Sequence, residues 1–278
     1  MKKISRRSFM AAAAVSVAAL AMTACGGSAS SAASSVASSA ASSEAASSAA
    51  AADLTTVEAG KLTMATNAAF PPYEMTTDAG EFEGIDVDTA KAIAEKLGLE
   101  LQIDDMDFDA ALLSVQQGKA DIVMAGVTVT DERKAVMDFS DSYATGIQSI
   151  IVPNDSDIAS PDDLAGKMIG TQRGTTGYIY CSDDFGDENV VAYDDGLTAV
   201  QALNNGQVDA VVIDNAPAQE FVAANPGLKV LDTSYAEEDY AIGMAKGSAL
   251  EDAVNKALEE LKADGTLQAI VDKYINAN

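Results

Sequence analysis

From Leu54 onward, short runs of β-favouring residues alternate with longer amphipathic stretches. Apolar residues spaced three and four apart are typical of helices that face a core, whereas short β-branched runs that end at Gly or Asp are typical of buried strands. The predicted strands are 61–66, 100–103, 121–125, 167–171, 190–192, 209–213, 228–231 and 240–245. The predicted helices are 88–97, 109–117, 177–183, 197–204, 216–224, 249–263 and 267–275. This alternation indicates an α/β fold with mainly parallel sheets, and roughly 225 residues are enough for two lobes.

The first 24 residues have the pattern of an export signal. Four basic residues within the first seven are followed by an uncharged, mostly apolar run that ends in small residues. This order is typical of a secretory signal, and the run is short for a transmembrane helix, which needs about 20 apolar residues. We therefore predict that residues 1–24 are a signal peptide.

The cleavage region at positions 22–26 resembles the lipobox of bacterial lipoproteins, with Met22 where that motif usually has Leu. The resemblance implies that Cys25 is diacylated and becomes the new N-terminus. The alternative is an ordinary signal in which the cysteine is incidental. Positions 5–10 also resemble a twin-arginine signal, so both the Sec and the twin-arginine export routes stay open.

The segment after Cys25 has the composition of a linker. Residues 26–52 are almost entirely Ser, Ala and Gly, with Glu44 as the only charge. Such a segment buries too little apolar surface to offset the entropy lost on ordering. We predict that residues 25–53 are the lipidated cysteine and a disordered tether, and that the folded part begins near Leu54.

The composition excludes several classes of function. Without any His, a Ser-His-Asp triad, a Cys-His dyad and a His-ligated zinc or haem site are impossible. The 17 Lys and Arg face 43 Asp and Glu, and a net charge of -26 argues against nucleic-acid binding. Once Cys25 is acylated, no intramolecular disulfide is available to Cys181, which we expect to be a partly buried thiol. No metal or cofactor is predicted.

Two segments at the ends of predicted strands carry candidate binding groups. Positions 66–74 place Asn67 and Phe70 on a loop stiffened by two prolines. Ligands in open α/β sheets bind at the carboxyl ends of strands, although an aromatic residue beside prolines often only packs. Positions 211–215 are an apolar strand that ends in Asp214. This carboxylate is suited to receive an ammonium group, or alternatively caps the helix that follows.

A third segment, 125–133, combines a glycine, a hydroxyl and an arginine. Gly126 leaves the backbone open to close approach, and Thr128 offers a hydroxyl. Arg133 follows on a short helical turn that we expect Thr130 to cap. Its guanidinium is suited to bidentate recognition of a carboxylate. Alternatively, Arg133 is a surface residue paired with one of the two acidic residues before it.

The fourth segment, 170–177, is a Gly- and Thr-rich turn before a predicted helix. Free backbone N–H groups and the helix dipole make such a turn an anion site. The Lys-Ser/Thr ending of a Walker loop is missing, and an ordinary helix N-cap is the alternative. Two anion-directed segments, one carboxylate and an aromatic loop would together form a site for a zwitterion, provided that they converge.

Taken in order, these segments resemble the amino-acid family of periplasmic-type solute-binding proteins of ABC importers. That family includes the glutamine, histidine and lysine/arginine/ornithine binders. The resemblance runs from about Gly60 to the C-terminus. The motifs that carry it are AFPPYE (69–74), GIDVD (84–88), GKAD (118–121), GVTVTDER (126–133), DFSD (138–141), GTT (174–176), VDA (208–210) and KADG (262–265).

The resemblance implies a two-lobed, type II periplasmic-binding-protein-like fold, with two parallel-rich sheets joined by a two-strand hinge. Lobe 1 is expected at 54–143 and 243–278, and lobe 2 at 147–239. Arg133 is implied to bind the ligand α-carboxylate, and Asp214 the α-ammonium. The other implied contacts are Thr128, Thr175 and Thr176 with the carboxylate, the Gly126 carbonyl and Thr128 with the ammonium, an aromatic sandwich of Phe70 and Phe108, and Asn67 and Gln172 as specificity positions.

The implied function is capture of a free, polar amino acid outside the cytoplasm. The protein would be a lipid-anchored monomer on the outer face of the cell membrane, and its partners an ABC permease and its ATPase. Asn67 stands where binders of basic amino acids carry Asp, which favours a neutral ligand. The alternative is an enzyme of the cyclohexadienyl or arogenate dehydratase type, which is similar to this family and uses the same cleft. A sensor domain or a receptor-feeding binding protein is the third reading.

Overall fold

The computed structural model describes residues 54–275, so the predicted signal, Cys25 and tether lie outside the described residues. The first of two large sheets has the strand order β5-β1-β6-β14-β7. Strands β5, β1 and β6 are parallel, and β14 is antiparallel to both of its neighbours. The strands are β1 (Lys61–Thr66), β5 (Glu100–Asp105), β6 (Ile122–Val123), β7 (Met137–Phe139) and β14 (Gly243–Ala245).

The second large sheet has six strands. Five follow the order β10-β9-β11-β8-β12, and β13 pairs with residues 144–148 of β8, whereas β12 pairs with residues 151–153. Strands β10, β9 and β11 are parallel, whereas β8 is antiparallel to β11, β12 and β13. The strands are β8 (Ala144–Pro153), β9 (Ile169–Gln172), β10 (Val190–Tyr193), β11 (Ala210–Asp214), β12 (Leu228–Val230) and β13 (Ala236–Tyr240).

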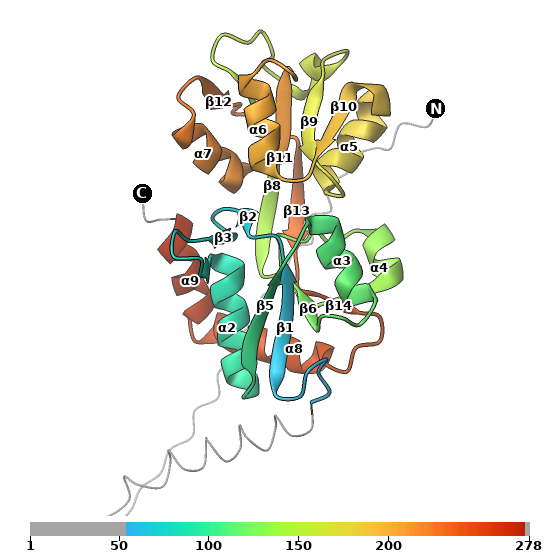
Figure 1. Cartoon of the computed structure of the whole chain (residues 1–278), viewed down its shortest axis with the longest axis vertical. Coiled ribbons are helices and arrows are strands. Elements are labelled where there is room, and N and C mark those ends of the chain that lie inside the picture. Colours follow the sequence, from blue (N-terminus) through green and yellow to red (C-terminus); the bar gives the residue numbers. More distant parts are fainter. Residues whose placement is uncertain (1–53, 276–278) are drawn as a thin grey trace, which may run out of the picture. The chain divides into compact units, whose positions relative to one another are not determined.

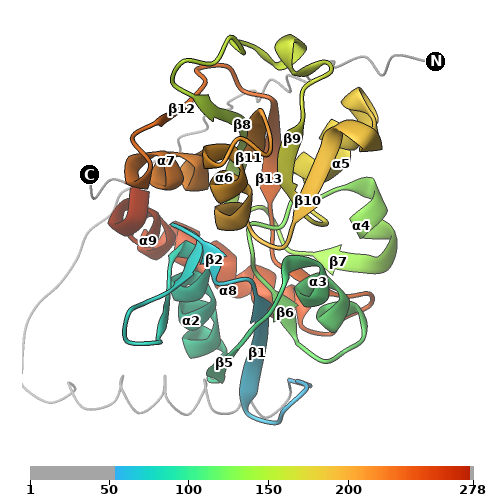
Figure 2. The same cartoon turned by 45° about the horizontal axis from the view of Figure 1, so that its top comes forward.

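Helices cover both faces of each large sheet, as expected when strands and helices alternate. In the first lobe, α2 (Ile85–Leu97), α8 (Glu251–Ala263) and α9 (Thr266–Ile275) pack on one face, and α3 (Phe108–Gln116) packs on the other, next to the short α4 (Asp131–Val136) (Figure 1). In the second lobe, α6 (Gly196–Asn204) and α7 (Asn215–Ala224) cover one face, and α5 (Thr176–Phe185) and η1 (Pro161–Leu164) cover the other (Figure 2). The turn η2 (Asp187–Asn189) follows α5.

Two strand connections join the lobes, and Figure 1 shows β8 and β13 running between them. The chain passes from β7 to β8 and returns from β13 to β14. The two connections are bonded to each other, because Ser140 N donates to Ile242 O at 2.9 Å and Tyr143 N donates to Tyr240 O at 2.9 Å. This architecture confirms the two-lobed α/β prediction. The sheets are mixed rather than mainly parallel as predicted, because β14 and β8 run antiparallel to all the strands that they pair with.

A small antiparallel sheet of β2 (Ala69–Phe70), β3 (Glu74–Thr76) and β4 (Phe82–Glu83) precedes α2. Its strands pair Phe70 directly with Glu74. A cis peptide bond joins Pro71 and Pro72 between them. The turn therefore places an aromatic ring and a carboxyl group of the AFPPYE motif next to each other.

Most predicted elements are confirmed to within three residues at each end, but one prediction was wrong. The single strand predicted at 240–245 is two strands in different sheets, β13 and β14, because the chain crosses between the lobes at Ala241 and Ile242. The strand predicted at 121–125 is limited to Ile122–Val123. The helix α2 begins at Ile85, three residues before its predicted start, and ends as predicted with Gly98 in the left-handed conformation. The long strand β8 was not predicted.

Two further observations concern the described residues as a whole. No helix within residues 54–275 is both long and apolar enough to cross a membrane. Cys181 on α5 is a free thiol with no exposed surface, more deeply buried than predicted, and burial raises its pKa to about 12. It therefore packs as a small core residue.

Candidate ligand-binding site

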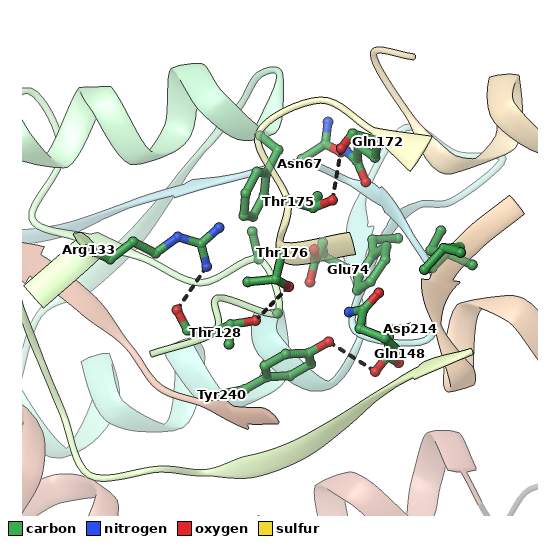
Figure 3. A pocket seen from close by; sticks show the side chains of 16 residues that line it. Asn67, Glu74, Thr128, Arg133, Gln148, Gln172, Thr175, Thr176, Asp214 and Tyr240 are labelled. Carbon is green, nitrogen blue, oxygen red and sulfur yellow. Dashed lines mark hydrogen bonds between the residues drawn. The ribbon is translucent and has the colours of Figure 1, made fainter. Parts of the chain in front are cut away.

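All ten residues predicted to contact a ligand line one cavity between the two large sheets. The cavity encloses about 430 Å³, including the part open to solvent. Several of its groups follow the carboxyl ends of parallel strands, the usual location of ligands in such sheets. Figure 3 shows Arg133 and Asp214 on opposite sides of this space. The predicted residues that line it are Asn67, Phe70, Phe108, Gly126, Thr128, Arg133, Gln172, Thr175, Thr176 and Asp214.

Arg133 is held at the cavity by its helix and by two carbonyl groups. Thr130 caps α4, as predicted, and its hydroxyl accepts from Arg133 N at 3.1 Å. The guanidinium donates to Thr128 O at 2.8 Å and to Gly174 O at 3.1 Å, and it lies 5.4 Å from the ring centre of Phe108. Burial lowers its pKa, although the negative charge of Glu238 opposes this effect. Such a buried cation is stabilised by an anion that enters the cavity.

The surface pairing considered for Arg133 is not what the structure shows. Only 8% of the residue is exposed, and within residues 54–275 no carboxylate oxygen lies within 4.0 Å of its guanidinium. The two acidic residues that precede it, Asp131 and Glu132, are exposed, whereas Arg133 is buried. Within the described residues, the Arg133 guanidinium therefore has no carboxylate partner in an ion pair.

Asp214 ends β11 on the other side of the cavity and is 2% exposed. One oxygen, Oδ1, accepts from Ala216 N at 3.0 Å, so the residue caps α7 as the alternative prediction required. The other oxygen, Oδ2, accepts from Ile147 N at 2.8 Å and from the Tyr240 hydroxyl at 3.0 Å. Burial raises the pKa of this carboxyl to about 6, although these three hydrogen bonds oppose the shift. Capping and lining the cavity are therefore compatible roles.

The two lobes contact each other directly across the cavity. Gln172 Nε2 donates to Asn67 Oδ1 at 2.9 Å, and Asn67 Nδ2 donates to Met106 O at 3.0 Å. The hydroxyls of Thr128 and Thr176 are 3.3 Å apart. With the bond from Arg133 to Gly174 O, these contacts bring the lobes together in a closed arrangement.

The helix α5 begins at the cavity, as the Gly- and Thr-rich turn predicted. Thr175 caps it by accepting from Tyr178 N at 3.3 Å, and the same hydroxyl donates to Gln172 O at 2.8 Å. On the facing lobe, Gly126 has φ +55° and its missing side chain makes room for the Phe70 ring, which would lie 3.0 Å from a Cβ atom. The glycine therefore lets the ring lie against the backbone.

Four polar residues that the sequence did not reveal lie in or against the cavity. Glu74, Gln148 and Tyr240 line it directly. Glu238 on β13 lies behind them, and its Oε2 accepts from Thr128 Oγ1 at 3.0 Å and from Gln148 Nε2 at 2.9 Å. Tyr240 orients Asp214, and Glu238 orients two lining side chains. Folding brings these side chains together, because Tyr240 lies 26 residues from Asp214 in the sequence, and Glu238 lies 110 residues from Thr128 and 90 from Gln148.

Glu74, which lines the cavity, forms a buried carboxyl pair with Asp86. Neither residue has exposed surface. Asp86 Oδ2 accepts from Gly126 N at 3.0 Å and from the Tyr143 hydroxyl at 2.8 Å. No N–H or hydroxyl group within the described residues donates to Glu74, whose carboxyl interacts with that of Asp86. Burial and the adjacent Asp86 hold the pKa of Glu74 well above its usual value, so the pair keeps a proton.

Residues 54–275 contain no group of three or more Cys, Asp and Glu side chains arranged to hold a metal ion. The geometry is instead that of a closed polar cavity for a small organic molecule. Residues 62–277 match the model of the bacterial extracellular solute-binding proteins, family 3. The chain belongs to this family. The match spans both lobes and confirms the predicted resemblance.

Individual amino-acid-binding proteins are similar to most of this chain. The L-cystine-binding protein TcyJ of Escherichia coli K12 is 33% identical over 225 residues, which cover 80% of this chain and 85% of TcyJ. The arginine-, lysine-, histidine-binding protein ArtJ of Geobacillus stearothermophilus has a TM-score of 0.75 and 34% identity, covering 78% of this chain and 96% of ArtJ. An ancestral arginine-binding protein bound to glutamine has a TM-score of 0.74 and 42% identity, covering 78% of this chain and 98% of the ancestral protein.

Membership of family 3 decides between the two classes of function that the sequence left open. The matched family and these relatives are solute-binding proteins, so the chain is a binding protein and not an enzyme of the dehydratase type.

Proposed function

We propose that this chain is the extracytoplasmic solute-binding lipoprotein of an ABC importer, which captures a free polar amino acid and delivers it to a membrane permease and its ATPase. The observation that carries the proposal is the placement of Arg133 and Asp214 in one buried cavity, on different lobes (Figure 3). An amino acid is a zwitterion, and burying it is favourable only where both of its charges are paired.

In the proposed complex, Arg133 binds the α-carboxylate with the hydroxyls of Thr128 and Thr176 and the turn at Thr175. Asp214 and the Gly126 carbonyl receive the α-ammonium. Phe70 and Phe108 enclose the side chain, and Asn67 and Gln172 meet its end. Relatives named for cystine, histidine and arginine binding support a polar amino acid as the class of ligand.

Ligand binding and lobe closure are coupled in this proposal. Arg133 belongs to the lobe of β1, and Asp214 belongs to the lobe of β11. A ligand that pairs with both residues bridges the lobes and therefore favours the closed over the open arrangement. Closure then presents a surface for the permease that depends on whether the cavity is filled.

The proposal also includes an N-terminal anchor. Residues 1–24 are removed as a signal, Cys25 is acylated, and 26–52 tether a monomeric binding domain to the outer face of the cell membrane. The Cys25→Ser variant should then be released into the medium when the producing cells are fractionated. Retention of that variant in the membrane fraction would contradict the anchor and leave the binding function untouched.

The binding function is tested by a thermal-shift screen of the chain without residues 1–25. The ligands are the twenty amino acids with ornithine, citrulline and cystine, because a ligand that binds the native state raises the melting temperature. A rise with one or a few of them supports the proposal and identifies the ligand. If none of these ligands raises the melting temperature, the proposed amino-acid binding is contradicted. Turnover of prephenate and arogenate would then be assayed.

A further inference from the structure

The charges around the cavity do not balance for a neutral ligand. Arg133 is the only cationic side chain that lines the cavity in residues 54–275. Four buried carboxyl groups lie in or directly against it, and a zwitterion adds no net charge. The four are Glu74, Asp86, Asp214 and Glu238.

Among these groups, Glu74 is the one whose only partner is another carboxyl group, that of Asp86. Asp86 accepts from Gly126 and Tyr143, and Asp214 caps α7. Glu238 accepts from Thr128 and Gln148. Glu74 lines the cavity, is 0% exposed, and accepts no hydrogen bond from an N–H or hydroxyl group of residues 54–275. Figure 3 shows it in the middle of the lining, between Arg133 and Asp214.

We infer that Glu74 is the countercharge for a positively charged ligand side chain, so that the cavity takes a basic amino acid. This inference rests on the proposed amino-acid function and specifies its ligand class. An ammonium or guanidinium group would supply the N–H donors that Glu74 lacks. The ring of Phe70, paired with Glu74 across β2 and β3, and the ring of Phe108 also favour a cation. Asn67 alone favours a neutral ligand, but Glu74 provides the carboxylate that position 67 lacks.

The groups that face Glu74 explain how a buried carboxyl is kept without a cation. They are Asp86 on α2, Asp105 at the end of β5 and Asp214 at the end of β11, together with Tyr143, whose hydroxyl donates to Asp86. Because each neighbouring carboxylate raises the pKa of Glu74, the empty cavity stores a proton on the Glu74–Asp86 pair. A bound cation reverses this effect, so its binding should release that proton.

The test compares L-arginine with L-citrulline, which has nearly the same shape but an uncharged end. Wild-type protein, Glu74→Gln and the control Glu81→Gln are titrated calorimetrically at pH 7.5. An amide at position 74 retains the size of a protonated carboxyl and still donates to Asp86, so the fold should be maintained. Glu81 lies on the same β3–β4 hairpin and is exposed. Wild type and E81Q should prefer arginine by at least about tenfold, and E74Q should lose most of that preference while binding citrulline as before.

A second measurement needs no variant. Titrations of wild type in phosphate and in Tris, which differ in ionisation enthalpy, give the number of protons released. Arginine should release close to one proton and citrulline close to none. An arginine preference that survives in E74Q, or equal proton release for both ligands, would overturn the role of Glu74. Binding of citrulline or glutamine but not arginine would overturn the basic-ligand inference and leave the proposed function intact. Failure to bind any amino acid would overturn both.

Discussion

Gln172 Nε2 donates to Asn67 Oδ1 over 2.9 Å, and this bond joins a strand end of one lobe to a strand end of the other. Asn67 is fixed in turn by the bond from its Nδ2 to Met106 O at 3.0 Å. Both side chains are nearly buried. The orientation of the two amides is therefore set by partners on both lobes, and the bond forms only when the cavity is closed.

This bond should contribute to affinity through closure. Asn67→Ala and Gln172→Ala should each weaken ligand binding, and a double-mutant cycle should couple the two residues by about 1 kcal/mol. The ligand for the cycle is the one found in the thermal-shift screen. Additive losses would show that each amide acts on the ligand alone and that the bond does not stabilise the closed arrangement.

Arg133→Ala should reduce affinity for an amino acid by at least about 2 kcal/mol, because the α-carboxylate would be buried without a countercharge. Arg173→Ala is the matched control. Arg173 follows β9, next to the cavity residue Gln172, but its side chain is 53% exposed and its Nε lies 3.5 Å from Asp194 Oδ1. Calorimetry should show near wild-type binding for R173A. Binding of R133A within threefold of wild type would remove Arg133 from the site.

Affinity should fall in acid because Asp214 must be ionised to receive an ammonium group. Burial raises its pKa in the free protein from 3.8 to about 6, and pairing with the ligand lowers that pKa again. Below pH 6 the dissociation constant should rise by up to about tenfold per pH unit.

The stability that Asp214 contributes through its raised pKa is present below about pH 4 and is lost as the pH rises through 6, so this carboxyl does not cause acid unfolding.

The variant Asp214→Asn separates this effect from that of Asp86, whose pKa burial also raises to about 6. Asparagine retains the helix cap but not the charge. The variant should bind at least about tenfold more weakly at pH 7.5 and should lose most of the pH dependence. A dissociation constant at pH 7.5 equal to that of wild type would refute the ammonium role, and an unchanged pH profile in the variant would assign the titration to Asp86.

The site was more predictable from sequence than its supporting residues were. Asn67, Gln172 and Asp214 each end a run of strand-forming residues, and the carboxyl ends of parallel strands lie at the same edge of a sheet. By contrast, Tyr240 and Glu238 lie on β13, which covers Ala236–Tyr240, whereas the sequence predicted a strand only from residue 240 onward. Their contacts with Asp214 and Thr128 span 26 and 110 residues of sequence, and no local pattern contains such information.

The strand β8 was missed for a related reason. Its central residues are buried on both faces, so the Ala144–Pro153 segment has no regular alternation of polar and apolar positions. It is fixed by pairing with β11, β12 and β13, all of which come later in the chain. The role inferred for Glu74 also could not be predicted from a local sequence pattern. The AFPPYE motif drew attention to Phe70, whereas the burial of Glu74 beside Asp86 is a property of the folded lobe.

Gly146→Ala should connect the strand pairing to the site. Gly146 lies on β8 opposite Glu238, and a Cβ atom there would clash with the Tyr240 ring and lie 2.5 Å from its hydroxyl oxygen. Tyr240 is 1% exposed and donates to Asp214 at 3.0 Å, so it can move aside only by breaking that bond. We expect a loss of about 1–3 kcal/mol in the free energy of unfolding and weaker ligand binding. The control Gly227→Ala adds a Cβ atom with nothing within 4 Å and should change neither. Urea unfolding with a ligand titration measures both quantities, and wild-type affinity in G146A would show that the Tyr240 hydroxyl does not orient Asp214.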